Sequence, residues 1–535
     1  MLQEIKIESI LGGHSPLAHF GRSDQYRASL GIDPSLDTNI DNDVYGTISS
    51  GLIRPVGVSK STSTTQAAPL WIVPNPKVSS TGNEYYIYDA QGSAYSITQS
   101  QVTDTLTALS DGGSLSSSIG NGCAYYDNYI YFAKNTDIAR YGPLNGTAAF
   151  DGTYWTGTLG KAALTDTTYP VLQFASIEIP NHVMLRHSDG RLYIADVVGN
   201  QGTLHYIETT KTTVEGDTNN GSTASKLTMG YGLWPTALES YGSDVAIALF
   251  EGSASVLGNF GRAKIAFWDT TSTKINKITW VEFPDPIITA MKNINGVLYI
   301  ASGNSQTKGF RISRFIGGYT VEEVGYFETG FAPLPGAVDG RATQLILGSI
   351  TTIPETAACV YSFGLRKGKI STGIFNVARA DSTSTTIGVT SLIFDGGNFA
   401  QPGFFFGAGK ASSEGSTHRT YAKSLSTNGP PVWWSQTYRI GRRFKIKKIR
   451  IPLPRSTTTS SAGVVPKIYF DDGTSSKTLQ TINATNYPTA SYLVVMRPDG
   501  AIGQNNFFLE FKWNDVAVFP IGLPITMEIE TIDET

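Results

Sequence analysis

The sequence carries little charge for its length. Of its 535 residues only 16% are charged, with 41 Lys and Arg against 44 Asp and Glu. The net charge of −3 predicts no general attraction to nucleic acid or to an anionic membrane. Because globular domains usually carry about a quarter charged residues, this low value together with 56 glycines favours many strands and turns over long exposed helices.

Cysteine is almost absent, and so are targeting and spanning segments. Cys123 and Cys359 lie in the apolar runs GCAYY and ACVYSF, which predicts two buried free thiols and no disulfide framework. The first residues, MLQEIKIESILGGHSP, lack a basic stretch followed by an apolar one, so we expect no signal peptide and synthesis in the cytoplasm. No apolar run approaches the ~20 residues that a membrane span needs.

Motifs of common enzyme chemistry are missing too. The chain has no G-x-S-x-G and no G-x-x-x-x-G-K-[ST] sequence, and its histidines form no H-x-x-x-H pair. One acidic cluster lacks the spacing of a calcium-binding loop, so we interpret it as a solvated loop. We therefore expect no catalytic residue, no cofactor and no metal. The residues of that cluster are Asp33, Asp37, Asp41 and Asp43.

What the sequence does contain is a repeated phrase. Residues 188–196 read SDGRLYIAD, with the Asp189-Gly190 pair that is typical of a two-residue hairpin turn of type I′. A phrase that recurs at intervals indicates a building unit rather than a catalytic motif. Close variants are YDNYIYFAK at 126–134, YGSDVAIAL at 241–249 and INGVLYIAS at 294–302.

The centre of each repeat is apolar on both faces, whereas a half-buried strand would alternate. Hairpin units covered on both faces indicate small sheets packed around an axis, which is a β-propeller. We expect about seven blades; six or eight stay open, and a long β-sandwich array is the alternative. The aligned segments are LWIV (70–73), IYFA (130–133), LYIA (192–195), VAIA (245–248), LYIA (298–301), LILG (345–348) and FFFG (404–407).

The two ends of the chain do not follow the repeat. Residues 1–60 are rich in Gly, Pro, Asp and Ser, which predicts an extended N-terminal arm with a short helix near DQYRASL. The propeller is expected at 61–428. Beyond SLSTNGPP, hairpins with DDG and PDG turns and the alternating PITMEIETI predict a small β-sandwich or jelly roll at 429–535.

A basic segment follows the second boundary. It is interpreted as an interaction patch for an acidic partner, an acidic glycan or nucleic acid, the last at most by non-specific contact. The structural alternatives are an edge strand protected by lysine, or a strand paired with the acidic strand at Glu528 and Glu530. Its members are Arg439, Arg442, Arg443, Lys445, Lys447, Lys448 and Arg450.

Three stretches of the N-terminal region resemble structural proteins of tailed bacteriophages. They are a GG-x-SP stretch, a DQY…S-x-GID stretch and an IRP stretch, and they precede the repeat. The matching residues are Gly12, Gly13, Ser15, Pro16, Asp24, Gln25, Tyr26, Ser29, Gly31, Ile32, Asp33, Ile53, Arg54 and Pro55. The resemblance implies a non-enzymatic virion component, made in the host cytoplasm and placed in the tail as a nozzle or hub, collar or fibre-anchoring part. Its implied partners are other virion proteins and further copies in a symmetric ring.

Two other functions stay open. A host-surface glycan-binding adhesin would use exposed aromatic residues, for which Trp433-Trp434 and Tyr154-Trp155 are candidates, with core packing as the structural alternative for the Trp pair. A propeller-type polysaccharide hydrolase would need two carboxylates roughly 5–10 Å apart on inner strands. The candidate carboxylates are Asp189, Asp196, Asp244 and Glu251.

Overall fold

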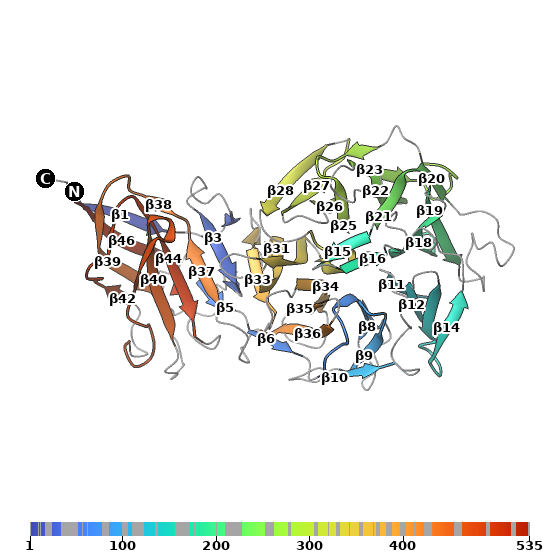
Figure 1. Ribbon diagram of the computed structural model, residues 1–535, viewed down its shortest axis with the longest axis horizontal. Helices are drawn as coiled ribbons and strands as arrows, with labels where there is room; N and C mark the ends of the chain where they lie inside the picture. Colours follow the sequence, from blue (N-terminus) through green and yellow to red (C-terminus); the bar gives the residue numbers. More distant parts are fainter. Residues whose placement is uncertain are drawn as a thin grey trace. The chain divides into compact units, whose positions relative to one another are not determined.

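The chain is described by a computed structural model that is built almost entirely of antiparallel strands (Figure 1). The structure describes residues 2–8, 10, 12–15, 24–30, 32–33, 52–55, 57–60, 63–76, 85–98, 105–109, 122–133, 137–155, 171–174, 177–180, 182–198, 201–208, 227–251, 262–275, 280–303, 309–318, 320–327, 332–341, 343–351, 357–366, 369–370, 375–380, 388–395, 403–410, 413–421, 431–453, 463–487, 493–514 and 521–532.

The chain divides into two compact units. Unit 1 joins Met1–Ser59, Thr351–Thr383 and Thr420–Thr535, and unit 2 joins Lys60–Ile350 with Ser384–Arg419. This division differs from the expected boundaries at 60/61 and 428/429, because the segment 351–383 groups with the two ends of the chain. Among the described residues, no helix is long and apolar enough to cross a membrane.

Unit 2 is a succession of small antiparallel sheets whose strands follow sequence order, the pattern expected of a β-propeller (Figure 1). Five of them consist of four strands in unbroken sequence order. These are β7 (Pro69–Pro74), β8 (Tyr85–Asp89), β9 (Ala94–Thr98) and β10 (Thr105–Ala108); β11 (Cys123–Tyr126), β12 (Tyr129–Ala133), β13 (Ile138–Gly142) and β14 (Ala149–Trp155); β17 (Met184–Arg186), β18 (Arg191–Val198), β19 (Gln201–Glu208) and β20 (Leu227–Tyr231); β21 (Leu233–Tyr241), β22 (Asp244–Glu251), β23 (Arg262–Trp268) and β24 (Val281–Glu282); β25 (Ile287–Ile294), β26 (Val297–Gly303), β27 (Phe310–Phe315) and β28 (Val321–Phe327).

Two further copies of the hairpin complete the described part of unit 2. They are β29 (Val338–Arg341) with β30 (Gln344–Thr351), and β34 (Gly388–Asp395) with β35 (Gly403–Lys410), to which β36 (Ser413–Tyr421) is added. The expectation of an all-β propeller is confirmed, whereas the exact number of blades stays a prediction. Shorter elements are the hairpin β15 (Val171–Phe174) and β16 (Ile177–Pro180), strand β6 (Gly57–Lys60) and the 3₁₀ turn Pro335–Ala337.

The repeated apolar segment is the second strand of its sheet in six of the seven aligned copies, from β12 to β35. The first copy was aligned one strand too early: LWIV lies in β7, a first strand, and the equivalent second strand is β8. Both strands are apolar and largely buried, so the pattern of apolar residues fits either one. The position of a strand within its sheet depends on which strands it pairs with, and the pattern of apolar residues does not indicate these partners.

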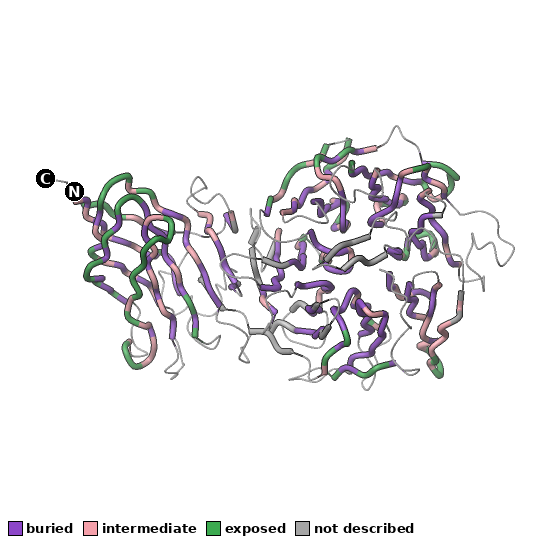
Figure 2. The backbone as a smooth tube through the Cα atoms, viewed as in Figure 1, coloured by how far each residue is buried: buried purple, intermediate pink, exposed green. Residues whose placement is uncertain are grey.

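The strands of unit 2 are largely buried (Figure 2), and neighbouring sheets pack face to face. Tyr88 of β8 packs with Phe132 of β12, their ring centroids 5.5 Å apart. Tyr193 of β18 meets Trp268 of β23 edge to face at 5.4 Å. Each cluster therefore joins two successive sheets, and this explains why the second strands are apolar on both faces.

The last sheet of unit 2 contacts the first. Thr65, ahead of β7, exchanges two backbone hydrogen bonds with Gly415 of β36. Tyr85 of β8 stacks on Phe405 of β35 with ring centroids 4.7 Å apart. These contacts join residues more than 300 positions apart in the sequence and close the succession of sheets on itself.

The hairpin turn quoted first differs from its prediction. His187 N–H donates to the Arg191 carbonyl and only Gly190 has a positive φ, of 84°, so the loop has three residues and is not a type I′ turn. Two-residue turns with both φ values positive do occur in sister repeats. They are Asp127-Asn128, at 44° and 68°, and Asn295-Gly296, at 51° and 84°.

Unit 1 is built around two sheets that share aromatic contacts, because Phe444 packs with both Phe470 and Phe507. This agrees with the expected β-sandwich. The first sheet has the order β1 (Leu2–Ile7), β46 (Ile525–Thr531), β39 (Phe444–Pro452) and β42 (Leu493–Met496), with β43 (Ile502–Gly503) also paired to β39. The second has the order β2 (Gly13–His14), β3 (Gln25–Leu30), β37 (Val432–Ser435), β44 (Asn506–Trp513), β40 (Val464–Phe470) and β41 (Ser475–Thr478), with β38 (Tyr438–Arg439) beside β44.

Smaller elements complete unit 1. A third sheet pairs β4 (Ile32–Asp33), β5 (Leu52–Pro55) and β45 (Ile521–Gly522). Strand β31 (Ala357–Arg366) pairs with β32 (Lys369–Ile370) and β33 (Phe375–Arg379), and a 3₁₀ turn spans Asp471–Gly473.

The described residues up to Pro55 differ from the expected arm, because they supply strands to unit 1. Strand β1 pairs with β46 along its whole length, and β3 pairs with β37. The segment expected to form a short helix, 24–30, contains strand β3, whose Tyr26 is buried against Trp433. Tertiary pairing thus overrides the local sequence signal here.

Several single-residue expectations can be checked. Cys123 and Cys359 are buried and form no disulfide with each other, as predicted. Trp433 is fully buried, as the core-packing alternative required, and the Trp434 indole N–H donates to Glu510 at 2.6 Å. Of the acidic cluster, Asp37, Asp41 and Asp43 lie outside the described residues, and Asp33 is described only by its backbone pairing with Arg54.

The close approach of neighbouring sheets gives a stability prediction. A Cβ atom on Gly122 would lie 2.0 Å from the His182 carbonyl oxygen of the next sheet, whereas one on Gly146, in a turn of the same sheet as Gly122, would meet nothing closer than 3.7 Å. We expect Gly122→Ala to lower the free energy of unfolding by about 1–3 kcal/mol or more, since backbone must shift. Gly146→Ala should change it little. Thermal and denaturant unfolding of both variants checks this; equal melting temperatures would contradict it.

Candidate functional site

The basic segment predicted as an interaction patch is divided between two sheets. Arg439 lies on β38, which pairs with β44. Arg442 and Arg443 are exposed in the turn before β39 and form no ion pair with a described residue. The other four, Lys445, Lys447, Lys448 and Arg450, lie on β39.

The basic residues of β39 face an acidic strand. Strand β39 lies between β46 and β42, so it is not an edge strand, and the edge-protection alternative is wrong. Lys447 Nζ is 2.9 Å from Glu530, and Arg450 is 2.5 Å from Glu528. The hydrogen bond from Lys447 holds the pKa of Glu530 below its ordinary value. Pairing with the acidic strand, the other alternative, is therefore confirmed.

The outer face of this sheet carries both signs of charge and an apolar margin. We define the outer face as Glu4 of β1, Glu528 and Glu530 of β46, Lys445, Lys447, Lys448 and Arg450 of β39, and the aliphatic residues Leu493, Val495 and Ile502. The three aliphatic residues are 49%, 42% and 37% exposed, respectively. Val495 is the cross-strand partner of Arg450 and Ile502 that of Lys445, so the aliphatic margin directly borders the charged centre.

The carboxylates considered for a hydrolase have structural partners. Asp196 is buried between two histidines, with its Oδ2 atom 3.0 Å from His205 Nε2 and its Oδ1 atom 3.6 Å from His182 Nδ1. No substrate reaches it there. Asp244 lies beside the β21–β22 turn, where it accepts a hydrogen bond from the Ser243 hydroxyl.

The other two carboxylates are also engaged. Asp189 accepts the Tyr193 hydroxyl at 2.5 Å and lies 3.5 Å from the Arg191 guanidinium. Glu251 lies 2.5 Å from the ammonium group of Lys264. Within the described residues, no group of three or more His, Cys, Asp and Glu is placed to hold a metal ion.

Three charged groups lie on three first strands of unit 2, and the last of them also accepts a backbone N–H from a fourth first strand. Lys292 of β25 lies 3.1 Å from Asp339 of β29, and the other oxygen of Asp339 accepts the Phe394 N–H of β34 at 2.9 Å. Glu239 of β21 lies on the other side of Lys292 and keeps some accessible surface, although protein atoms surround it densely. Burial raises the pKa of Glu239 to about 7, and the charge of Lys292 opposes this rise.

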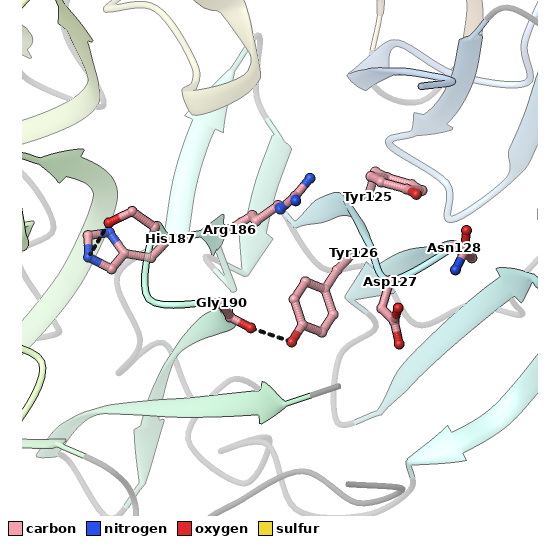
Figure 3. Close-up of a pocket in the computed structure, with 8 residues that line it drawn as sticks. Tyr125, Tyr126, Asp127, Asn128, Arg186, His187 and Gly190 are labelled. Carbon is pink, nitrogen blue, oxygen red and sulfur yellow. Dashed lines mark hydrogen bonds between the residues drawn. The ribbon is translucent and has the colours of Figure 1, made fainter. Parts of the chain in front are cut away.

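A pocket opens between the turns of two neighbouring sheets (Figure 3). Its volume is about 510 Å³, within the range of small-ligand sites. One wall comes from the end of β11 and its turn, the other from the end of β17 and its turn. The lining residues are Tyr125, Tyr126, Asp127, Asn128, Arg186, His187, Ser188 and Gly190.

Arg186 and Tyr125 form one end of the pocket. The Arg186 side chain reaches toward Tyr125, and its guanidinium carbon lies 6.0 Å from the ring centroid (Figure 3). The Asp127 side chain, which also lines the pocket, points away from Tyr125. Arg186 is exposed and forms no ion pair with any described residue. The sequence reasoning missed both residues, because an arginine and a tyrosine at strand ends carry no motif; their place ahead of repeated turns was the one available signal.

Hydrogen bonds fix the walls of the pocket. The Tyr126 hydroxyl donates to the Gly190 carbonyl at 2.5 Å and so joins the two turns. His187 is buried, and its Nε2 atom lies 3.1 Å from the Ser243 carbonyl. Since a carbonyl can only accept, Nε2 carries the proton, and Nδ1 pairs with the Ser240 hydroxyl at 2.9 Å. His187 thus anchors the wall to the next sheet.

Comparison with known proteins adds no function. No protein-family model and no curated protein matches the chain. Among solved structures, the N-terminal domain of Nup159 has 11% identity and a TM-score of 0.38 over 74% of this chain and 100% of that one. YCF48 bound to D1 peptide has 9% identity and a TM-score of 0.40, and the match covers 69% of this chain and 98% of that one. An exo-beta-1,3-galactanase from Phanerochaete chrysosporium has 7% identity and a TM-score of 0.25, and the match covers 87% of this chain and 100% of that one. Similarity at this level carries no argument about substrate or partner.

The raised pKa of Glu239 gives a pH prediction. Between its ordinary value of 4.5 and about 7 the folded chain binds a proton that the unfolded chain has lost, so stability falls as pH rises through this window. We expect Glu239→Gln to remove a part of that fall on the order of 2 kcal/mol. Urea unfolding at pH 5 and pH 7.5 measures it, with the exposed Glu323→Gln as control. A wild-type pH dependence that survives in Glu239→Gln would contradict the assignment.

Proposed function

We propose that the chain is a non-enzymatic structural component of a tailed-phage virion, in the tail, that acts by assembling with further copies of itself and with other virion proteins. The outer face of the β1–β46–β39–β42 sheet is the observation that carries this proposal. It combines exposed aliphatic residues, which gain from being covered, with a centre of both charge signs that can meet complementary charges on a protein partner.

The charge pattern of the outer face favours a second copy as its occupant. Glu528 and Glu530 face their own lysines and arginine, so the face is close to neutral and can meet a like face without net repulsion. A nucleic acid would instead require a continuous excess of positive charge. The same argument makes the basic segment part of a protein interface rather than a separate anion-binding patch.

The N-terminal motifs support a structural role. Gly12 N–H donates to the Asp24 carbonyl and Ser15 N–H to the Tyr26 carbonyl, so the GG-x-SP and DQY stretches lie side by side. The GID and IRP stretches likewise pair with each other in β4 and β5. The residues that resemble the phage proteins therefore hold backbone segments together, and none of the described contacts among them assembles acid–base chemistry.

The hydrolase alternative has less support. All four carboxylates considered for it are held by structural partners, and Asp196 is inaccessible. We expect no release of reducing ends when the protein is incubated with a panel of bacterial capsular and cell-wall polysaccharides. Product release that depends on one of these carboxylates would contradict the non-enzymatic assignment.

Assembly is tested by the mass of the protein in solution. We expect light scattering after gel filtration to give a multiple of the chain mass, and negative-stain images to show symmetric particles. Leu493→Glu places a charge in the apolar margin opposite Pro452, which offers it no cation, and should lower the mass toward the monomer, because burying an uncompensated charge is costly.

The control is Ile316→Glu, which changes a comparably exposed aliphatic residue of unit 2 and should leave the mass unchanged. A wild-type protein that stays monomeric at tens of micromolar would contradict self-assembly. Equal loss of mass in both variants would show that the outer face is not the interface.

A further inference from the structure

We propose that the pocket between the β11–β12 and β17–β18 turns binds a saccharide that carries a carboxylate. This site belongs to unit 2 and is separate from the outer face of unit 1, so it goes beyond the assembly role. The pocket has the size of a small-ligand site, and its eight lining residues come from two rigidly joined turns.

The carboxylate of the ligand pairs with Arg186. Its guanidinium is exposed at the pocket wall and has no ion pair among the described residues, in contrast to Arg191, which is bonded to Glu208 at 2.6 Å. A guanidinium presents a planar fork that matches a carboxylate with two parallel hydrogen bonds. The ring of Tyr125 lies against the same guanidinium and limits the directions from which an acid group can approach.

The rest of the pocket suits the hydroxyl groups and ring of a sugar. Tyr125 offers an aromatic face next to Arg186, on which the C–H face of a pyranose can pack. Asn128 and Ser188 offer side chains that both donate and accept, and the Asp127 carboxylate accepts from hydroxyls. Such a mixture of donors and acceptors matches a polyhydroxylated ligand better than an apolar one.

The charge balance of the pocket limits the ligand to one acid group. Arg186 and Asp127 are its two formally charged lining residues besides the hydrogen-bonded His187, and their charges cancel. A polyanion such as nucleic acid, or a multiply phosphorylated ligand, would be repelled by Asp127 and find one cation. A sugar with a single carboxylate places its charge at Arg186 and its hydroxyls at Asp127.

The pocket is held in its open shape without a ligand. The Tyr126 hydroxyl donates to the Gly190 carbonyl, and His187 is hydrogen-bonded to Ser240 and Ser243. Asp127 and Asn128 form a tight turn in which both residues have a positive φ. Little reordering of these walls then opposes binding, and Arg186 is the side chain that has to become ordered.

The test uses two acidic probes with one carboxylate each: cellobiouronic acid and sialyllactose. Their binding is measured by calorimetry and by saturation-transfer NMR, with cellobiose and lactose as neutral parents. We expect at least one acidic probe to bind and its neutral parent to bind roughly tenfold or more weakly, since a charge-assisted hydrogen-bond pair is lost. Arg186→Gln should weaken the acidic probe by a similar factor, and Arg186→Lys by less. Tyr125→Ala should weaken acidic and neutral probes alike.

The matched control is Arg341→Gln, an exposed arginine that directly precedes the equivalent turn of another sheet. It should leave binding unchanged, and the melting temperature of every variant should equal that of the wild type. The proposal is overturned if no acidic probe binds, if Arg186→Gln binds the probe as the wild type does, or if a glutamate-bearing peptide binds at this site in place of the saccharides. Assembly is measured by mass, so its failure and the failure of this site are distinguishable.

Discussion

A small sheet that is apolar on both faces has to be covered on both, and this constraint determines the architecture of unit 2. Its second strands, from β8 to β35, leave no face for water, so each sheet becomes the cover of the next. The series can end only by returning to its beginning, as the contact between Tyr85 and Phe405 does. Packing this close also demands residues without side chains where backbones meet, as Gly122 does at the His182 carbonyl.

The same constraint determines where charge can be placed. In the interior of unit 2 a charged group needs a partner, and Asp196, Asp339 and Lys292 each have one. Protein atoms surround Glu239 densely, and this burial raises its pKa although the charge of Lys292 opposes the rise. Groups without such partners, Arg186 foremost, lie at the turns, where water solvates them. Recognition is therefore expected at the rims of the sheets, and the interior is left to packing.

The sequence contained the repeat and its turns, because both are local patterns of apolar residues and of Asp, Asn and Gly. It did not contain the partner of a strand. Strand β1 pairs with β46 and β3 with β37, and the sequences LQEIKI and QYRASL do not indicate a partner strand hundreds of residues away. The basic residues of β39 were visible, yet their neutralisation by Glu528 and Glu530 depends on register. The pocket depends on two turns brought together, so Arg186 could not be distinguished from other exposed arginines.

The pairing of β1 with β46 fixes an order of events in synthesis. Leu2 faces Glu530 and Ile7 faces Ile525, so β1 has no partner until β46 has left the ribosome. At about 5–20 residues per second that wait is roughly half a minute to two minutes. Unit 2 lies between the two partners in the chain and can fold during this interval. The sheet that bears the outer face is completed last, which delays any self-association through it until the rest of the subunit is in place.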